Sequence, residues 1–272
     1  MNVRQIRTDA RAALGNDRRG ALLDTLLCCC LPTLAALSVN LLYFALDRAV
    51  AGRTGGIGAS SLRTAYHAAN AALYILSTAV SLGSVLLAFL FKALLLRRAR
   101  AQAVSGRDRH LSLRLVWRVL LLAILSGVYI ALWSCLLVVP GIIAAYRYRF
   151  APFLLADHPD YLPSQALRES CRMTRGRKAG LVRLDLSFLY YYVPLALAET
   201  LMNVGTLTTL FETYGVPFPA LSYEQMLALY AAGACLSVLA CCLFAAHAMA
   251  ASATAYDRTP VAGPEPGPEE FV

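Results

Sequence analysis

The chain has 272 residues, of which 58% are hydrophobic and only 15% are charged, and its formal net charge is +9. Soluble domains carry about 25% charged residues, so a water-soluble protein of this size could not hide so much apolar surface. The length allows one membrane domain with short tails and excludes a large separate soluble domain. The composition therefore predicts an integral membrane protein.

Residues 1–20 form the first predicted element, a basic amphipathic helix. Val3, Ile6, Ala10 and Leu14 recur at helical spacing, and arginines lie between them. Such a helix can lie on the inner membrane surface and bind anionic lipid headgroups. A plain basic flank of the first membrane span explains the same residues equally well.

Six apolar segments follow within residues 21–256 and predict an all-α, polytopic transmembrane helix bundle. A helix needs about 20 apolar residues to cross the hydrocarbon core, which four segments reach without difficulty. The fourth segment is predicted to be broken by Pro140-Gly141, and both a full crossing and a re-entrant path fit it. The six segments are 21–46, 66–91, 116–134, 135–156, 184–207 and 226–251.

The distribution of basic residues favours six spans with both termini in the cytoplasm. With six spans, five basic residues in 1–20, eight in 92–118, six in 157–183 and Arg258 lie inside, and three in 47–65 lie outside. Five spans would export the six in 157–183, against the positive-inside rule. The excess of arginine over lysine indicates a bacterial protein, and we expect the bacterial cytoplasmic membrane as its location. The tail, 257–272, is rich in Pro, Gly and Glu and is predicted to be disordered.

Four ionisable residues within the apolar segments form the candidate intramembrane polar site: Arg147, Arg149, Asp185 and Glu199. Charges at membrane depth are costly and therefore suggest a function. Asp185 and Glu199 are 14 residues apart, which places them on one face of a continuous helix. We expect Arg149 to pair with Asp185, and Arg147 to reach toward Glu199. The alternative is that these ion pairs only lock the bundle, or that the arginines extend to the interface.

Two further helices carry regular stripes of small and polar residues. In the second segment the stripe includes Ser77, Ser81 and Ser84, and in the sixth it includes Gly233 and Ser237. Such stripes are typical of close helix packing, and the wall of a solute pathway is the alternative.

Residues 157–177 are predicted to form a turn followed by an amphipathic helix at the cytoplasmic membrane surface. Asp157, His158 and Asp160 could suggest a metal, but no distant cluster completes a ligand set. No nucleic-acid-binding fold accompanies the basic helix, so nucleic acid is not an expected partner. Seven of the eight cysteines lie in apolar runs, where cysteine acts as a small hydrophobic residue.

Catalytic signatures are absent from the sequence, which contains no GxSxG, HExxH, P-loop or GxGxxG motif. We therefore expect no catalytic residues, no cofactor and no metal. The expected partners are the lipid bilayer with its anionic headgroups, and either a second copy of the chain or another membrane protein.

The central block from VVPGII to LDLSF resembles a bacterial membrane family known as domain of unknown function 975. The residues that carry the resemblance are Pro140, Gly141, Tyr146, Tyr148, Ala151, Pro152, Asp157, Pro159, Ala166, Ser170, Met173, Gly176, Asp185, Ser187 and Phe188. The chain departs from the family at Asp17-Arg18-Arg19, where an aromatic residue is frequent, and in a longer loop before the sixth segment. A fainter resemblance is to the membrane domain of some glycerophosphodiester phosphodiesterases. Both imply a polytopic membrane protein and no catalytic residues.

Three functions fit the sequence. The first is a non-enzymatic accessory or envelope-homeostasis factor, which the lack of catalytic motifs and the basic surface helices favour. The second is a transporter or channel component for a small molecule or ion, which the acidic residues of the fifth segment and the Pro-Gly break favour. The third is an enzyme that acts on lipid headgroups. A polar cavity that reaches the membrane midplane around Arg147 and Glu199 would favour the second, and a fully packed bundle would exclude it.

Overall fold

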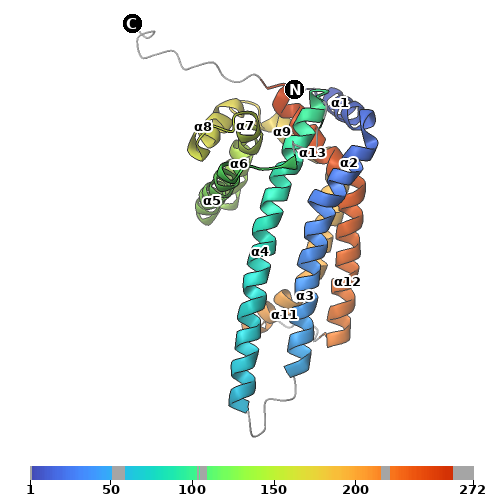
Figure 1. Ribbon diagram of the computed structural model, residues 1–272, viewed down its shortest axis with the longest axis vertical. Coiled ribbons are helices and arrows are strands. Elements are labelled where there is room, and N and C mark those ends of the chain that lie inside the picture. Colours follow the sequence, from blue (N-terminus) through green and yellow to red (C-terminus); the bar gives the residue numbers. More distant parts are fainter. Residues whose placement is uncertain (1, 51–58, 103, 105–108, 216–220, 260–272) are drawn as a thin grey trace. The chain divides into compact units, whose positions relative to one another are not determined.

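The computed structural model describes residues 2–50, 59–102, 104, 109–215 and 221–259. These residues contain helices and turns and no strand, as the predicted all-α class requires. The chain divides into two compact units, each of which is described by itself (Figure 1). Unit 1 comprises residues 1–23, 88–190 and 244–272, and unit 2 comprises 24–87 and 191–243.

Unit 1 contains the predicted turn and both predicted surface helices. In it, α5 pairs with α6, α7 packs on α8, and α1 packs on α13. Its helices are α1 (Val3–Asn16), α5 (Leu113–Leu136), α6 (Val138–Tyr148), α7 (Ala151–Asp157), α8 (Pro163–Met173), α9 (Lys178–Leu186) and α13 (Ala246–Asp257). Helix α2 (Arg18–Thr25) begins in this unit and ends in unit 2. The unit also contains the C-terminal part of α4 (Ala59–Ala99).

Unit 2 contains the larger part of α4 together with helices from both ends of the chain. Here α3 packs on α12, and α11 packs on α12. The thiols of Cys30 and Cys242 lie 3.2 Å apart, so residues far apart in sequence meet in the core of this unit. Its other elements are the π-helical turn η1 (Leu26–Cys30), α3 (Leu31–Val50), α10 (Leu189–Met202), α11 (Val204–Thr213), α12 (Tyr223–Ala240) and the start of the π-helical turn η3 (Cys241–Ala245).

Four helical stretches among the described residues are long and apolar enough to cross a membrane. They are Arg18–Val50, Arg63–Ala99, Leu113–Leu136 and Glu224–Asp257, and the bent pair α9 and α10 would make a fifth. These stretches coincide with five of the six predicted segments. The remaining segment, 135–156, consists of short helices.

The predicted break at Pro140-Gly141 is wrong in position. The chain turns three residues earlier, at Leu137, which adopts an extended conformation with φ −163° and ψ 150°. Pro140 then lies in the first turn of α6, where a missing amide hydrogen costs nothing because that turn has no helical acceptor. Helix α6 folds back along α5 (Figure 1). With 11 residues, α6 is about 16 Å long and too short to span a bilayer by itself.

The predicted fifth span, 184–207, is also interrupted. Helix α9 ends at Leu186 and α10 begins at Leu189. The hydroxyl of Ser187 donates to the carbonyl oxygen of Leu184 at 2.6 Å, and the amide of Phe188 donates to the backbone carbonyl oxygen of Asp185 at 2.8 Å. These local bonds compete with the helical ladder and end α9. Asp185 and Glu199 therefore do not share a face of one continuous helix.

The two predicted surface helices are amphipathic, but their apolar faces are covered by protein. In α1, Ile6 and Ala10 are buried where this helix packs on α13. In α8, Ala166 and Leu167 are buried where this helix packs on α5 and α7. Their apolar stripes therefore stabilise unit 1, and the contact of their basic faces with lipid headgroups stays a prediction.

Candidate functional site

Arg149 and Asp185 form the expected ion pair, inside unit 1. The guanidinium Nη2 of Arg149 lies 2.7 Å from Oδ1 of Asp185, and Nη1 binds the other carboxylate oxygen. The hydroxyl of Tyr146 donates to the same carboxylate at 2.8 Å, and Arg149 also donates to Ser252 at 2.8 Å. The pair thus ties the end of α6 to α9 and α13 through a bidentate contact of the strong kind.

Arg147 contributes its backbone to the structure. Its carbonyl oxygen accepts a hydrogen bond from the hydroxyl of Ser170 at 2.6 Å, and the amide of Phe150 donates to that hydroxyl at 3.2 Å. One buried serine of α8 therefore satisfies both backbone groups that the break between α6 and α7 leaves open. The side chain of Arg147 makes no ion pair with any described residue. Its expected contact with Glu199 would join the two units and stays a prediction.

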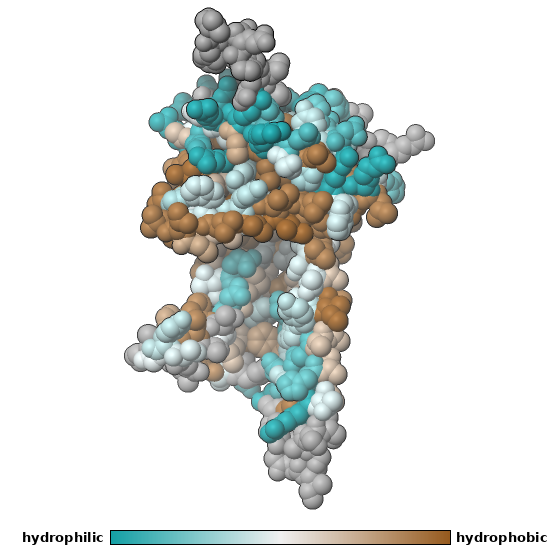
Figure 2. All heavy atoms as spheres, turned by 90° about the vertical axis from the view of Figure 1, so that its left-hand side faces the viewer, coloured by the Kyte–Doolittle hydropathy of each residue, from teal (hydrophilic) through white to brown (hydrophobic). Residues whose placement is uncertain are grey.

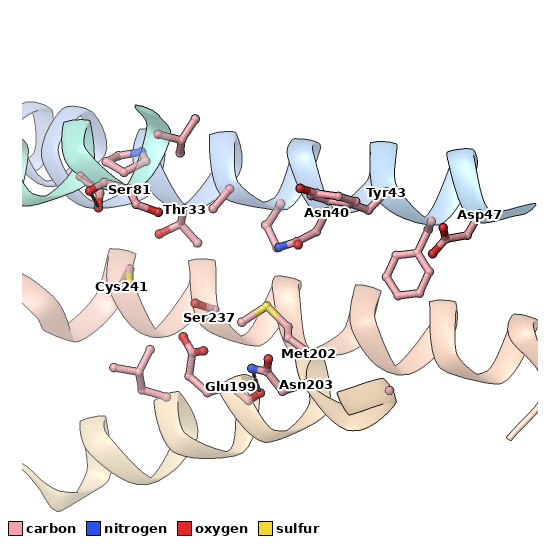
Figure 3. Close-up of a pocket in the computed structure, with 18 residues that line it drawn as sticks. Thr33, Asn40, Tyr43, Asp47, Ser81, Glu199, Met202, Asn203, Ser237 and Cys241 are labelled. Atoms are coloured by element: carbon pink, nitrogen blue, oxygen red, sulfur yellow. Dashed lines mark hydrogen bonds between the residues drawn. The ribbon is translucent and has the colours of Figure 1, made fainter. Parts of the chain in front are cut away.

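Glu199 lies on α10 in unit 2 and lines a cavity of about 670 Å³. Asp47 of α3 lines the same cavity, and no lysine or arginine is among its described lining residues. The carboxylate of Glu199 has no hydrogen bond or ion pair with a described side chain, and it points toward Ser237 (Figure 3). The cavity therefore carries two acidic groups without a basic counterpart.

The other walls of this cavity supply neutral polar groups and aromatic rings from α3, α4 and α12 and from Asn203, just after α10. Tyr43 and Phe44 line the cavity about one helical turn before Asp47. The hydroxyl of Tyr66 donates to Asp47 at 2.9 Å. The neutral polar lining residues are Thr33, Asn40, Tyr43, Ser81, Ser84, Asn203 and Ser237 (Figure 3).

The small-residue stripes explain how helices approach each other around this cavity. A Cβ atom at Gly233 of α12 would lie 2.8 Å from the carbonyl oxygen of Ala198, so this glycine allows α12 to touch α10. Close packing is thus the role of Gly233. Ser81, Ser84 and Ser237, which belong to the same two stripes, instead line the cavity. Close packing therefore accounts for Gly233, and the wall of a solute pathway stays a prediction for the three serines.

An ionic layer in unit 1 joins the ends of helices that are far apart in sequence. Arg100, just after α4, binds Asp157 and Asp257, each at 2.6 Å. We define the layer by these residues together with the pairs Arg98–Asp17, Arg118–Asp160 and Arg258–Asp9. The hydrogen bonds that Arg100 donates to Asp157, and next the one that it donates to Asp257, raise the pKa of Arg100 above its ordinary value. Figure 2 shows hydrophilic side chains above a band of hydrophobic ones over the α5–α6 pair.

The predicted turn at 157–160 is part of this layer. Asp157 accepts hydrogen bonds from Arg100 and from the hydroxyl of Tyr256, at 2.6 and 2.8 Å. Both of its carboxylate oxygens are therefore committed to protein partners. Among the residues that the structure describes, no group of three or more His, Cys, Asp or Glu side chains is placed to hold a metal ion.

Sequence reasoning found Glu199 and missed the α3 side of the cavity. Asn40 and Asp47 are seven residues apart, two helical turns, so they lie on one face of α3. Asn40 lies inside the first apolar segment, and its spacing to Thr33 and Asp47 could have identified a polar stripe there. Asp47 was assigned to the loop because it follows the predicted end at residue 46.

Comparisons with protein-family models, with curated proteins and with solved structures found no match for the chain. The resemblance of the central block to domain of unknown function 975 stays a prediction. The functional proposals below therefore rest on the residues and their geometry.

Proposed function

We propose that the chain is a multi-pass protein of the bacterial cytoplasmic membrane with both termini in the cytoplasm. The ionic layer supports this orientation because it joins the basic segments at 1–20, 97–118 and 157–183 and the end of α13. These are the segments that the positive-inside rule assigns to the cytoplasm. Six spans remain our proposal for the path of the chain, with 135–156 as the short fourth segment.

The hairpin of α5, α6 and α7 returns to the side from which it enters. Arg118, near the start of α5, binds the carbonyl oxygen of Pro159 and lies 3.9 Å from Asp160, just beyond α7. The tip of the hairpin is apolar, since the exposed residues Leu136 and Val139 flank the turn at Leu137. A full crossing and a re-entrant hairpin both leave 157–183 in the cytoplasm.

The cavity of unit 2 binds a small organic cation, and the chain acts as a transporter or channel component for it. The observation that carries this proposal is a cavity of about 670 Å³ with Glu199 and Asp47 in its wall and no basic lining residue among those described. Cavities of about 300 to 1,000 Å³ are typical of small-molecule sites. The carboxylates attract a positive charge, and the rings of Tyr43 and Phe44 can face an ammonium group.

The other two sequence-based functions receive less support. An accessory or envelope-homeostasis factor needs no solute cavity, so the cavity around Glu199 favours transport over that role. An enzyme acting on lipid headgroups would need catalytic groups, and we propose a non-enzymatic protein. A second copy of the chain or another membrane protein remains a proposed partner, because large apolar side chains are exposed on both units.

Binding of ammonium compounds to the purified full-length protein tests the proposed function. We expect choline to bind and its neutral isostere, 3,3-dimethyl-1-butanol, not to bind. Glu199→Gln removes one cavity charge and keeps the shape of the side chain. It should weaken choline binding about tenfold or more, because one close charge pair at an effective dielectric constant of 20 is worth several kcal/mol.

Glu224→Gln is the matched control. Glu224 lies in unit 2 at the first turn of α12 and does not line the cavity. This variant should change choline affinity by less than about twofold, since exposed charges a Debye length away are screened. Equal affinities for choline and the neutral alcohol, or equal effects of the two substitutions, would contradict a cation site at Glu199.

A further inference from the structure

A second cavity, of about 510 Å³, lies in unit 1 between α1, the start of α9 and the end of α13. Three arginines line it, Arg177, Arg183 and Arg258, and no carboxylate is among its described lining residues. It is separate from the cavity that Glu199 lines in unit 2, and its binding properties do not depend on cation binding there.

Two of these arginines belong to the start of α9. Arg177 is the N-cap of α9, Gly180 and Arg183 follow at three-residue intervals, and all three residues line the cavity. Gly180 has no side chain, so the helix surface between the two guanidinium groups is bare. Gly176 reverses the chain just before α9 with φ +74°, a conformation that favours glycine.

The charges of the cavity are only partly neutralised by the protein. Arg258 is paired with Asp9 of α1. Arg177 and Arg183 have no acidic partner among the described residues, so the cavity wall keeps two unpaired positive charges.

Next to the lining residue Arg177, the start of α9 has backbone hydrogen-bond donors of its own. The amides of Lys178 and Ala179, the first two of α9, have no backbone acceptor among the described residues, and no side chain caps this end. The N-terminal end of a helix carries a partial positive charge and favours anions. Helix dipole and guanidinium groups therefore act in the same direction.

We propose that this cavity binds a phosphate group, with Arg177 and Arg183 as its main charged ligands. Guanidinium groups bind phosphate oxygens through paired hydrogen bonds, which distinguishes them from the point charge of an ammonium group. A lipid headgroup and a soluble phosphorylated compound both carry this group. The cavity lies beside Arg258, a member of the ionic layer, at the end of the unit that we assign to the cytoplasm.

Two measurements on the purified full-length protein distinguish the two sources of phosphate. Calorimetric titration with inorganic phosphate measures binding of the free anion. Native mass spectrometry counts phosphatidylglycerol molecules retained by the protein and compares them with phosphatidylcholine. Each is made on the unchanged protein and on the double variant Arg177→Gln/Arg183→Gln.

The matched control is Arg168→Gln/Arg175→Gln. It removes the same charge from exposed arginines of the same unit that do not line the cavity. The cavity variant should weaken phosphate binding or phosphatidylglycerol retention about tenfold, and the control less than about twofold. A second variant, Arg177→Lys/Arg183→Lys, keeps the charge and should give an intermediate loss because lysine cannot form the paired contact.

If the cavity variant loses only the binding of inorganic phosphate, the ligand is a soluble phosphorylated compound. If it loses the retention of phosphatidylglycerol, the ligand is a lipid headgroup. Equal losses in the cavity variant and the control would overturn the proposal, because binding would then follow net charge. It is also overturned if neither probe responds to the cavity variant while both glutamine variants keep the thermal midpoint of the unchanged protein.

Discussion

Asp185 is the acceptor on which two side chains of unit 1 converge. Arg149 binds it through two nitrogen atoms, and the hydroxyl of Tyr146 donates to it at 2.8 Å. The side chains of Arg149 and Asp185 are only 17% and 21% exposed, so solvent screens the pair weakly. Removing one partner of such a pair leaves the other charge without compensation.

Asp185→Asn should therefore destabilise the protein by about 2 kcal/mol, toward the lower end of the cost of breaking buried pairs because some solvent access remains. Chemical unfolding in mild detergent measures the free energy of unfolding. Asp160→Asn is the control, because Asp160 is 99% exposed and lies 3.9 Å from Arg118. We expect no measurable change in the free energy of unfolding of this control. Similar losses of stability in both variants would contradict a special role for Asp185.

The sequence identified this pair and Glu199 because charges in apolar segments are rare and easily recognised. It could not identify the partners that come from elsewhere in the chain. Ser252 beside Arg149 is an ordinary polar residue until tertiary packing brings it to the pair.

At the scale of elements, the close pairing of α5 with α6 depends on a glycine. A Cβ atom at Gly141 would lie 2.1 Å from Oγ of Ser134 and 3.0 Å from its Cα atom. The hydroxyl could rotate away, but the backbone atom could not. Gly141 is therefore required for the close approach of these two helices.

Gly141→Ala should destabilise the protein by about 1 to 3 kcal/mol through overpacking. Gly127→Ala is a matched substitution in α5, where a Cβ atom meets no atom within 4 Å. Because alanine is the better helix former, that control should be neutral or stabilising by up to about 1 kcal/mol. Measuring the free energy of unfolding of both variants tests this prediction. Equal destabilisation of the two variants would exclude steric contact at Gly141 as the cause.

The apolar segments of most helices could be predicted from hydropathy, whereas the helix breaks could not. Proline and glycine at 140 and 141 suggested a break, yet proline fits the first turn of α6 and glycine serves packing. The break between α9 and α10 depends instead on the Ser187 hydroxyl bonding the carbonyl oxygen of Leu184. Serine makes such bonds in many continuous helices, so the sequence pattern alone does not reveal this break.

At the scale of the whole molecule, the central claim is that all basic segments lie on one side of the membrane. The ionic layer joins residues from the chain's beginning, middle and end, for example Asp17, Arg100, Asp157 and Asp257. Ion pairs between partly exposed groups are each worth about 1 kcal/mol or less. Their value here is that they require these segments to meet at one surface of unit 1.

Cysteine accessibility in intact cells and in inverted vesicles tests this claim most directly. The native cysteines are replaced, and single reporter cysteines are placed at Ser164 in α8, at Val138 at the hairpin tip or at Thr213 in α11. We predict that an impermeant maleimide labels position 164 only from the cytoplasmic side and position 213 only from the outside. Position 138 should be labelled only from the outside, as six spans require, and resistance to labelling from both sides would instead mean a re-entrant hairpin. Labelling of position 164 from the outside would contradict the one-sided basic surface and the topology built on it.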